Sequence, residues 1–433
     1  MRTFGLLLST LSLLALAPIN SFALGVPQSA LIEKRQVTTS NAPSFVAAAW
    51  YPSWLSSQVP PEIDGFRHVL TLMFILYSNS LTSVDPGQVI ITDADRELLP
   101  RFVAEAKKNG VKAMLSIGGW TGSRYFSRAV MPRQRDRFIE GLLKVVDEFG
   151  LDGLDFDWEY PNAKGIGCNE NKRADADNFL AFLQALRAHP KGQSLILSAA
   201  AHLNPWLGRD GNSLSDVSKF AEALDFVAIM GYDIYGRWSG GTVGPNAPLV
   251  NTCSVEPSST PTVSGAVQSW NFAGLPLNKT VLGVPTYGYG YNVSPLEAGK
   301  MAAGGDVPSF MRFRGEWMSL LSWVSYLVPD VCGVTPKTYD GTFTFKALTT
   351  EGFLDNEGNA MPGVTYKFDE CSKTPFLYDP AREIMVSYDN AQSMAEKGAY
   401  INAQQLRGFS AWAGIGDHND ILIGSLNMAL GRV

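Results

Sequence analysis

The sequence predicts an α/β fold, a (β/α)8 TIM barrel that carries a small α+β insertion between its seventh and eighth strands. Eight short apolar runs alternate along the chain with stretches of helical periodicity. The eight runs lie at residues 45–50, 68–76, 112–117, 151–156, 195–199, 226–230, 280–284 and 408–412. Nearly continuous apolar runs are typical of parallel strands buried on both faces, and eight strand and helix units close into a barrel.

Amphipathic stretches separate most of these runs. Apolar residues recur there at three- and four-residue spacing, which predicts helices that cover the outside of the barrel. The clearest stretches are residues 96–109, 133–149, 174–188 and 389–405.

An inserted domain is predicted by the long interval between Val284 and Gly408, because one crossover helix needs far fewer residues. The interval is rich in aromatic residues and threonine, with turn signals such as Asp340-Gly341. We expect a strand-rich insertion at about residues 290–385. It should stand beside the C-terminal face of the barrel, where barrel enzymes have their active sites.

The N-terminus has the features of a secretory signal peptide at residues 1–23: Arg2, an apolar run at 4–17, and small residues before the end. The run is shorter than the roughly 20 residues needed to span a bilayer, so we expect no membrane anchor. Lys34 and Arg35 suggest that a pro-segment at 24–35 is removed. The mature protein, residues 36–433, is then secreted and extracellular.

Four cysteines form an even set, and in an oxidising compartment they are expected to be bridged. Cys168 and Cys253 follow the fourth and sixth strands, while Cys332 and Cys371 fall in the insertion. Pairing within one structural region predicts Cys168 with Cys253 and Cys332 with Cys371. The two N-x-[S/T] sequons, at Asn278 and Asn292, are predicted glycosylation sites.

Composition excludes several classes of function. The chain has 35 Lys and Arg against 41 Asp and Glu, a net charge of -6, and no cationic block, which argues against a nucleic-acid partner. Its four His and four Cys show no zinc spacing, so we expect no metal. The sequence also lacks a glycine-rich phosphate loop, and no cofactor is predicted.

The sharpest chemical feature is the acidic run at residues 151–161. Alternate residues of a strand share a face, so Asp155, Asp157 and Glu159 point into the barrel while the large apolar residues between them face the helices. Burial and like charge both raise the pKa of a carboxyl, so one acid should stay protonated near neutral pH. A protonated carboxyl at the mouth of a barrel can act as a general acid. Asp152 is out of phase and is expected to be structural.

These residues resemble the signature of glycoside hydrolase family 18, and in particular its secreted fungal-type chitinases. The D-x-x-D-x-D-x-E pattern at 152–159 is joined by SIGGW at 116–120. Further matches occur in the expected order: WYPSW at 50–54, MGYD at 230–233, GVPTYG at 283–288 and Trp412. The resemblance implies a glycosidase that hydrolyses β-1,4 linkages between N-acetylglucosamine units of chitin.

The resemblance also implies residue roles. Glu159 matches the general acid, Asp157 the group that orients the substrate acetamido group, and Asp155 the residue that shares a proton with Asp157. Tyr232 matches the donor to the acetamido carbonyl oxygen, and the mechanism is expected to be retaining and substrate-assisted. Ser116 matches the hydroxyl that hydrogen-bonds this Asp pair, and the resemblance groups it with the substrate-binding residues Tyr51, Trp120, Met230, Asp233, Trp238 and Trp412.

Two alternatives share this fold. A chitin-binding lectin would lack the terminal Glu of the motif, and Glu159 is present. An endo-β-N-acetylglucosaminidase would lack the long insertion. The sequence departs from the usual family pattern at Ala49-Trp50, where a glycine commonly precedes the aromatic pair, and at Gly231. We expect a monomer whose partner is chitin or chitooligosaccharide.

Overall fold

The computed structural model describes residues 44–57, 73–77, 89–236, 238–239, 242–253, 261–302, 311–312, 330–335 and 341–432. The predicted signal peptide and pro-segment lie outside the described residues. Within the described ranges, every helix is too short or too polar to cross a membrane.

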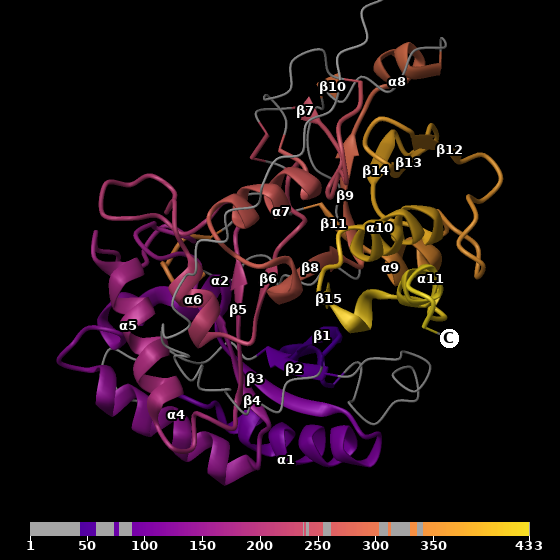
Figure 1. The fold of residues 1–433 in the computed structure, drawn as a ribbon. Helices are drawn as coiled ribbons and strands as arrows, with labels where there is room; N and C mark the ends of the chain where they lie inside the picture. Colours follow the sequence, from indigo (N-terminus) through magenta and orange to yellow (C-terminus); the bar gives the residue numbers. More distant parts are fainter. Residues whose placement is uncertain are drawn as a thin grey trace, which may run out of the picture. The chain divides into compact units, whose positions relative to one another are not determined.

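Eight parallel strands close into a barrel, in the order β1-β15-β8-β6-β5-β4-β3-β2 (Figure 1). The strands are β1 (Val46–Pro52), β2 (Met73–Tyr77), β3 (Lys112–Gly118), β4 (Gly153–Asp157), β5 (Ile196–Ala201), β6 (Phe226–Ile229), β8 (Thr280–Pro285) and β15 (Gly408–Trp412). All eight predicted strands are confirmed, with ends that differ by a few residues; the predicted start of the second strand, at residues 68–72, lies outside the described residues. The predicted barrel is therefore the observed one.

Helices surround the barrel, and α1, α4, α5 and α6 contact one another in succession along its outside (Figure 1). The four predicted helices are confirmed as α1 (Asp93–Lys108), α4 (Arg135–Phe149), α5 (Asp175–Ala188) and α10 (Ala391–Ala403). The others are α2 (Gly119–Gly122), α3 (Phe126–Ala129), α6 (Ser218–Ala223), α7 (Val263–Phe272), α8 (Pro295–Ala302), α9 (Phe345–Thr350) and α11 (Ile421–Ala429), with short 3-10 turns at Ser53–Leu55, Ser123–Tyr125, Leu277–Lys279 and Gly414–Gly416.

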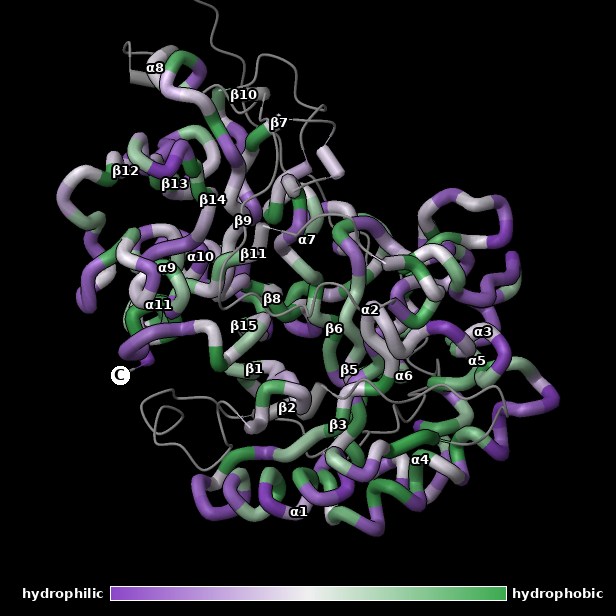
Figure 2. Tube along the Cα trace, turned by 180° about the vertical axis from the view of Figure 1, so that it is seen from behind, coloured by the Kyte–Doolittle hydropathy of each residue, from purple (hydrophilic) through white to green (hydrophobic). Residues whose placement is uncertain are grey.

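The core lies between the strands and these helices. Phe156 of β4 packs edge-to-face on Phe182 of α5, with ring centroids 5.3 Å apart. Figure 2 shows β3, β5 and β6 as mainly hydrophobic, whereas α1 alternates between hydrophobic and hydrophilic residues. This contrast follows from burial of the strands on both faces and of the helix on one.

A separate antiparallel sheet of five strands lies between β8 and β15 in the chain, in the order β11-β9-β14-β13-β12 (Figure 1, orange). Its strands are β9 (Tyr287–Asn292), β11 (Thr342–Thr344), β12 (Thr365–Asp369), β13 (Thr374–Asp379) and β14 (Ile384–Ser387). Together with α9 it forms the predicted α+β insertion. A short pair, β7 (Thr242–Val243) with β10 (Met311–Arg312), joins the loop after β6 to the insertion.

Both disulfides link the barrel to the insertion, and the predicted pairing was wrong. Cys168 is bonded to Cys332, with Cα atoms 5.6 Å apart, and Cys253 to Cys371, with Cα atoms 5.4 Å apart. Strand β5 separates the loops after β4 and β6 on the barrel rim, so Cys168 and Cys253 are not neighbours. The insertion is long enough to reach both loops, so each disulfide connects the barrel to the insertion.

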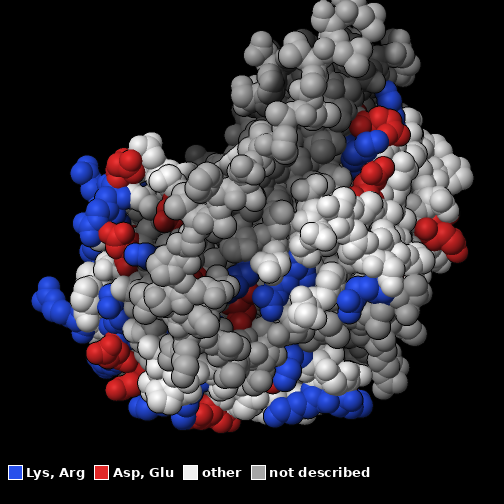
Figure 3. Space-filling view, in the orientation of Figure 1, with Lys and Arg blue, Asp and Glu red and all other residues white. Residues whose placement is uncertain are grey.

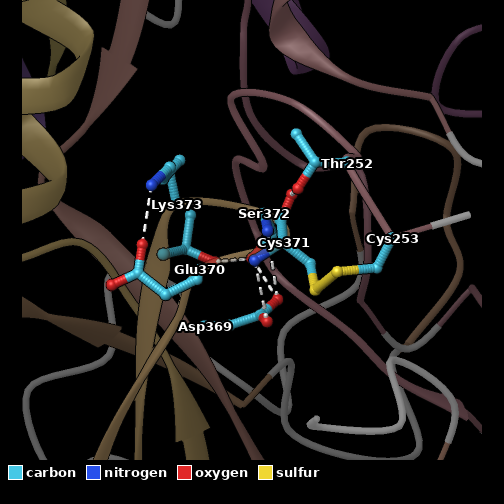
Figure 4. The surroundings of a disulfide bond; sticks show 8 residues. Thr252, Cys253, Asp369, Glu370, Cys371, Ser372 and Lys373 are labelled. Carbon is cyan, nitrogen blue, oxygen red and sulfur yellow. Dashed lines mark hydrogen bonds and ion pairs between the residues drawn. A yellow bond between two sulfur atoms is a disulfide. The ribbon is translucent and has the colours of Figure 1, made fainter.

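The Cys253–Cys371 bridge lies at the turn between β12 and β13 (Figure 4). The Asp369 carboxylate accepts hydrogen bonds from the backbone N–H groups of Cys371 and Ser372, each at 3.2 Å. The N–H of Thr252 donates to the Cys371 carbonyl at 3.1 Å. Hydrogen bonds on both sides therefore hold the two segments at the geometry that the bridge requires.

The predicted glycosylation sites occupy different surroundings. Asn278 is exposed in the turn before β8, at the barrel end opposite the strand C-termini, while Asn292 is half-buried at the end of β9. Glycosylation of both stays a prediction.

Charged groups on the surface and in the interior differ in their pairing. Acidic and basic side chains lie side by side on the described part of the surface (Figure 3), as in the exposed pair of Lys191 with Asp147. Lys397 of α10 and Asp389, by contrast, form an ion pair that is fully buried. Asp389 also accepts a hydrogen bond from Ser393 at 2.7 Å.

Removal of one partner from the buried pair should be costly. We predict that Lys397→Met lowers the free energy of unfolding by about 3–5 kcal/mol, because it leaves the Asp389 charge buried without its cation. The double variant Asp389→Leu/Lys397→Met should recover most of that loss. Lys191→Met, the control at an exposed pair, should cost at most about 1 kcal/mol. Urea unfolding measures all three, and equal losses for the two single variants would contradict the prediction.

Candidate active site

Three carboxyls line the inside of the barrel at the C-terminal end of β4. Asp155 is 0% exposed, Asp157 5% and Glu159 9%. On the opposite face of the same segment, the Trp158 ring stacks on Phe126 of α3 with centroids 4.9 Å apart. The predicted alternation is confirmed: the acids face the lumen and the apolar residues face the helices.

Asp155 receives hydrogen bonds from three different strands. Ser116 Oγ of β3 and Trp50 Nε1 of β1 donate to Oδ2 at 2.9 and 3.1 Å, and Ser198 Oγ of β5 donates to Oδ1 at 2.6 Å. Ser116, Asp155 and Ser198 pair directly across adjacent strands, so their side chains emerge in one row. The resemblance implied the Ser116 contact, whereas the roles of Trp50 and Ser198 were missed.

The backbone that carries Asp157 and Glu159 is fixed on both sides. The N–H of Glu159 donates to Ser123 Oγ at 2.9 Å, and Asn169 Nδ2 donates to the Glu159 carbonyl at 2.7 Å. Gly118 of β3 approaches so closely that an added Cβ would lie 2.3 Å from the Asp157 carbonyl oxygen, and its φ is +107°. These contacts set where the Glu159 side chain can point.

Burial shifts the ionisation of the whole row toward the neutral form. It raises the pKa of Asp155, and burial together with the charges of Glu159 and Asp155 raises the pKa of Asp157 well above its usual range. For Glu159, burial raises the pKa to about 8. The charge of Asp233 adds to this rise, whereas a hydrogen bond from Tyr160 opposes it. A pKa of about 8 favours the protonated form of Glu159 at neutral pH.

A second polar cluster faces this row from the end of β6 and the insertion. Asp233 has a left-handed backbone, with φ 57°, and its N–H donates to Asn246 Oδ1 at 2.8 Å. Its carboxylate accepts hydrogen bonds from the hydroxyls of Tyr289, at 2.6 Å, and Tyr287. The Tyr232 ring lies edge-on to Tyr287 with centroids 6.0 Å apart. The first strand of the insertion thus positions Asp233.

Aromatic side chains lie around the carboxyls. Trp412, half-buried at the end of β15, has its ring 6.2 Å from Trp50 and 6.4 Å from Trp54. Trp120 is 46% exposed and Trp238 52% exposed, with the latter edge-on to Tyr289 at 5.4 Å. Exposed indole faces of this kind can stack on an apolar ligand surface.

Met230 is half-buried and packs against two groups of residues, the lumen side chains of the barrel and the tyrosines of the insertion. The neighbouring Gly231 leaves no room for a side chain, because an added Cβ would lie 2.8 Å from the Gly283 carbonyl oxygen. Close approach of β6 and β8 therefore explains the glycine at this position.

The expectation that Tyr51 lines the cleft was wrong. Its side chain is 1% exposed and packs on Phe102 of α1, with ring centroids 5.8 Å apart, in the core outside the barrel. Adjacent residues of a strand face opposite ways, so Trp50 points into the lumen. Asp152 has the expected structural surroundings: it accepts hydrogen bonds from Lys112 Nζ at 2.9 Å and from the Ala113 N–H at 3.0 Å.

In the part of the chain that the structure describes, no group of three or more His, Cys, Asp or Glu residues is arranged to hold a metal ion. The carboxyls of the acidic row are instead surrounded by hydroxyl, indole and phenol groups.

The ionisation of Glu159 should appear in the pH dependence of stability. Above about pH 4.5 the unfolded chain loses this proton, while the folded chain keeps it up to about pH 8, so stability falls as pH rises through this window. We predict that Glu159→Gln has a higher Tm than the wild type above pH 8 and that the difference shrinks toward pH 4.5. The exposed Glu140→Gln should leave the slope of Tm against pH unchanged. Equal slopes for Glu159→Gln and the wild type would contradict this account.

Known proteins resemble this chain in sequence and in fold. The model of glycosyl hydrolases family 18 matches residues 46–417. The chain is 38% identical over 402 residues to a chitinase-like effector of Moniliophthora roreri, covering 91% of this chain and 95% of that relative. It is 38% identical over 395 residues to a chitinase-like effector of Moniliophthora perniciosa, covering 89% and 87%. The crystal structure of a chitinase from Rhizomucor miehei is similar with a TM-score of 0.76 and 28% identity, covering 88% of this chain and 99% of the other. The chain therefore belongs to family 18 of the glycosyl hydrolases.

Proposed function

We propose that this protein is a secreted chitinase that hydrolyses β-1,4 linkages between N-acetylglucosamine units, with Glu159 as the general acid and base. The observation that carries the proposal is the buried acidic row of β4, where Glu159 lies beside Asp157 and burial raises the pKa of Glu159 to about 8. The family membership and the chitinase from Rhizomucor miehei support the same reaction.

The mechanism that fits this row uses the substrate as its own nucleophile. Asp157 and Glu159 stand two residues apart on one face of the strand segment, so Asp157 cannot approach the anomeric carbon from the side opposite Glu159. Asp157 Oδ1 is buried and has no hydrogen-bond partner among the described residues, which leaves it able to accept from the N–H of the acetamido group. Family 18 is a known exception to the rule of a carboxylate nucleophile.

Hydrolysis then proceeds in two steps. Glu159 gives its proton to the glycosidic oxygen while the acetamido oxygen bonds to the anomeric carbon, which releases the leaving sugar and forms a cyclic oxazolinium ion. Asp157 orients the acetamido N–H and Tyr232 its carbonyl oxygen. In the second step the Glu159 carboxylate takes a proton from water, whose oxygen opens the ring at the anomeric carbon. Two displacements at one carbon retain its configuration.

Binding of an uncharged polysaccharide requires apolar ring faces more than charges. We assign Trp412 as the floor beneath the sugar at the cleavage point, with Trp120 and Trp238 as platforms further along the chain of sugars. Asp233 and Met230 complete the surroundings of the acetamido group. Secretion is supported by the two disulfides, because such bonds persist in oxidising compartments.

A second candidate is chitin binding without cleavage. It is favoured by the name of two relatives, chitinase-like effector, which does not itself specify catalysis. The presence of Glu159, with its raised pKa, favours the enzyme instead.

Incubation with a hexamer of N-acetylglucosamine separates these candidates. We predict that the wild type shortens the hexamer, and that Glu159→Gln lowers kcat by about 10²- to 10⁴-fold while it still binds, because only proton transfer is lost. Glu140→Gln, on the exposed face of α4, should match the wild type. Product lengths followed by chromatography measure cleavage, and calorimetry with the hexamer measures binding.

Binding of the hexamer by the wild type with no shorter products would favour the lectin. Equal cleavage of a fully deacetylated hexamer would contradict the mechanism, because that substrate has no acetamido oxygen to act as nucleophile.

A further inference from the structure

The backbone of Glu159 is held at both of its polar groups by side chains from outside β4. Its N–H donates to Ser123 Oγ at 2.9 Å, and its carbonyl oxygen accepts from Asn169 Nδ2 at 2.7 Å. Asn169 is 4% exposed, and its Oδ1 has no hydrogen-bond partner among the described residues. The side-chain amide of Asn169 is therefore directed at the residue that carries the proposed acid.

The loop between Glu159 and Asn169 closes tightly around this hydrogen bond. Gly165 lies inside the loop with φ +51°, and an added Cβ there would lie 2.0 Å from the Glu159 carbonyl oxygen and 2.5 Å from Asn169 Nδ2. A glycine is needed where the backbone comes so close. The loop thus returns Asn169 to the end of β4.

A covalent bond and two hydrogen bonds hold this part of the loop against the insertion. The disulfide of Cys168 fixes the residue directly before Asn169. Arg124 contacts both sides of that bridge: its carbonyl accepts from the Glu170 N–H at 2.9 Å, and its Nη1 donates to the Val331 carbonyl at 2.8 Å. Arg124 also follows Ser123, which binds the N–H of the acid, so one short turn is connected to both contacts.

We propose that Asn169 is a positioning residue for Glu159, and that the Cys168–Cys332 disulfide keeps Asn169 in place. A buried carbonyl that loses its donor is unfavourable, so the backbone turns to find another donor or water. Such a turn changes the backbone angle at Glu159 and with it the direction of the acid. The effect on catalysis rests on the proposed chitinase function, whereas the effect on the backbone does not.

The direct test is hydrogen exchange of the Glu159 backbone N–H in the folded protein. We expect exchange to be about tenfold faster in Asn169→Ala and in the double variant Cys168→Ser/Cys332→Ser, because each loosens the segment that holds this amide. Unchanged exchange in both variants would overturn the proposal. This readout needs no turnover, so it stands even if the protein does not cleave chitin.

Two controls match these variants. Asn271→Ala, on α7, also removes a side-chain amide that donates to a backbone carbonyl, at 3.0 Å. Cys253→Ser/Cys371→Ser removes the other bridge between barrel and insertion, beside which the backbone hydrogen-bonds to Asp369 and not to the acidic row. Both controls should leave exchange at Glu159 as in the wild type. Equal acceleration in the controls would mean a general loss of stability and would also overturn the proposal.

The kinetic test uses the hexamer. Asn169→Ala and Cys168→Ser/Cys332→Ser should each lower kcat by about 10- to 100-fold with KM nearly unchanged, because a misdirected acid impairs proton transfer and not binding. The triple variant should lose no more than the larger of the two effects, since both act through one contact. Wild-type kcat in both variants, or additive losses in the triple variant, would contradict the coupling. A wild type that does not cleave the hexamer would instead refute the proposed function.

Discussion

Burial of Asp155, Asp157 and Glu159 on one face of β4 is the constraint on which the rest of the site depends. Three carboxyls in a closed lumen cannot all ionise, so the barrel must supply either donors or protons. Donors from β1, β3 and β5 surround Asp155, while burial keeps a proton on Glu159. The neighbouring strands thus give Asp155 three hydrogen-bond donors, whereas Glu159 is the acid of the row.

The insertion contributes to the same electrostatic arrangement. Tyr287 and Tyr289 belong to its first strand, β9, and their hydroxyls hold Asp233, whose charge in turn raises the pKa of Glu159. The two disulfides tie the same insertion to the loops after β4 and β6. A domain that appears from sequence to be an addition therefore helps to set the properties of the acid.

Local periodicity was sufficient to predict the strands and the acidic row, since both depend on residues close in sequence. Contacts between strands were harder to predict. The prediction that Tyr51 lines the cleft was wrong by one residue, because Trp50 faces the lumen. In a strand, a shift of one residue reverses the face on which a side chain lies. Alternate residues of β5 face the barrel lumen, and this alternation could have identified Ser198 as a lumen residue. The disulfide pairing depended on where a long insertion crosses the barrel rim, which periodicity does not encode.

The configuration of the newly formed reducing end tests the central claim most directly, because it reports the number of displacements at the anomeric carbon. Proton NMR in the first minutes of hexamer cleavage resolves the α and β anomers before they equilibrate. Attack by the acetamido oxygen followed by attack by water makes two displacements at the anomeric carbon. This mechanism predicts that the β anomer appears first. Initial formation of the α anomer would mean direct attack by water and would contradict the assignment of Glu159 and Asp157.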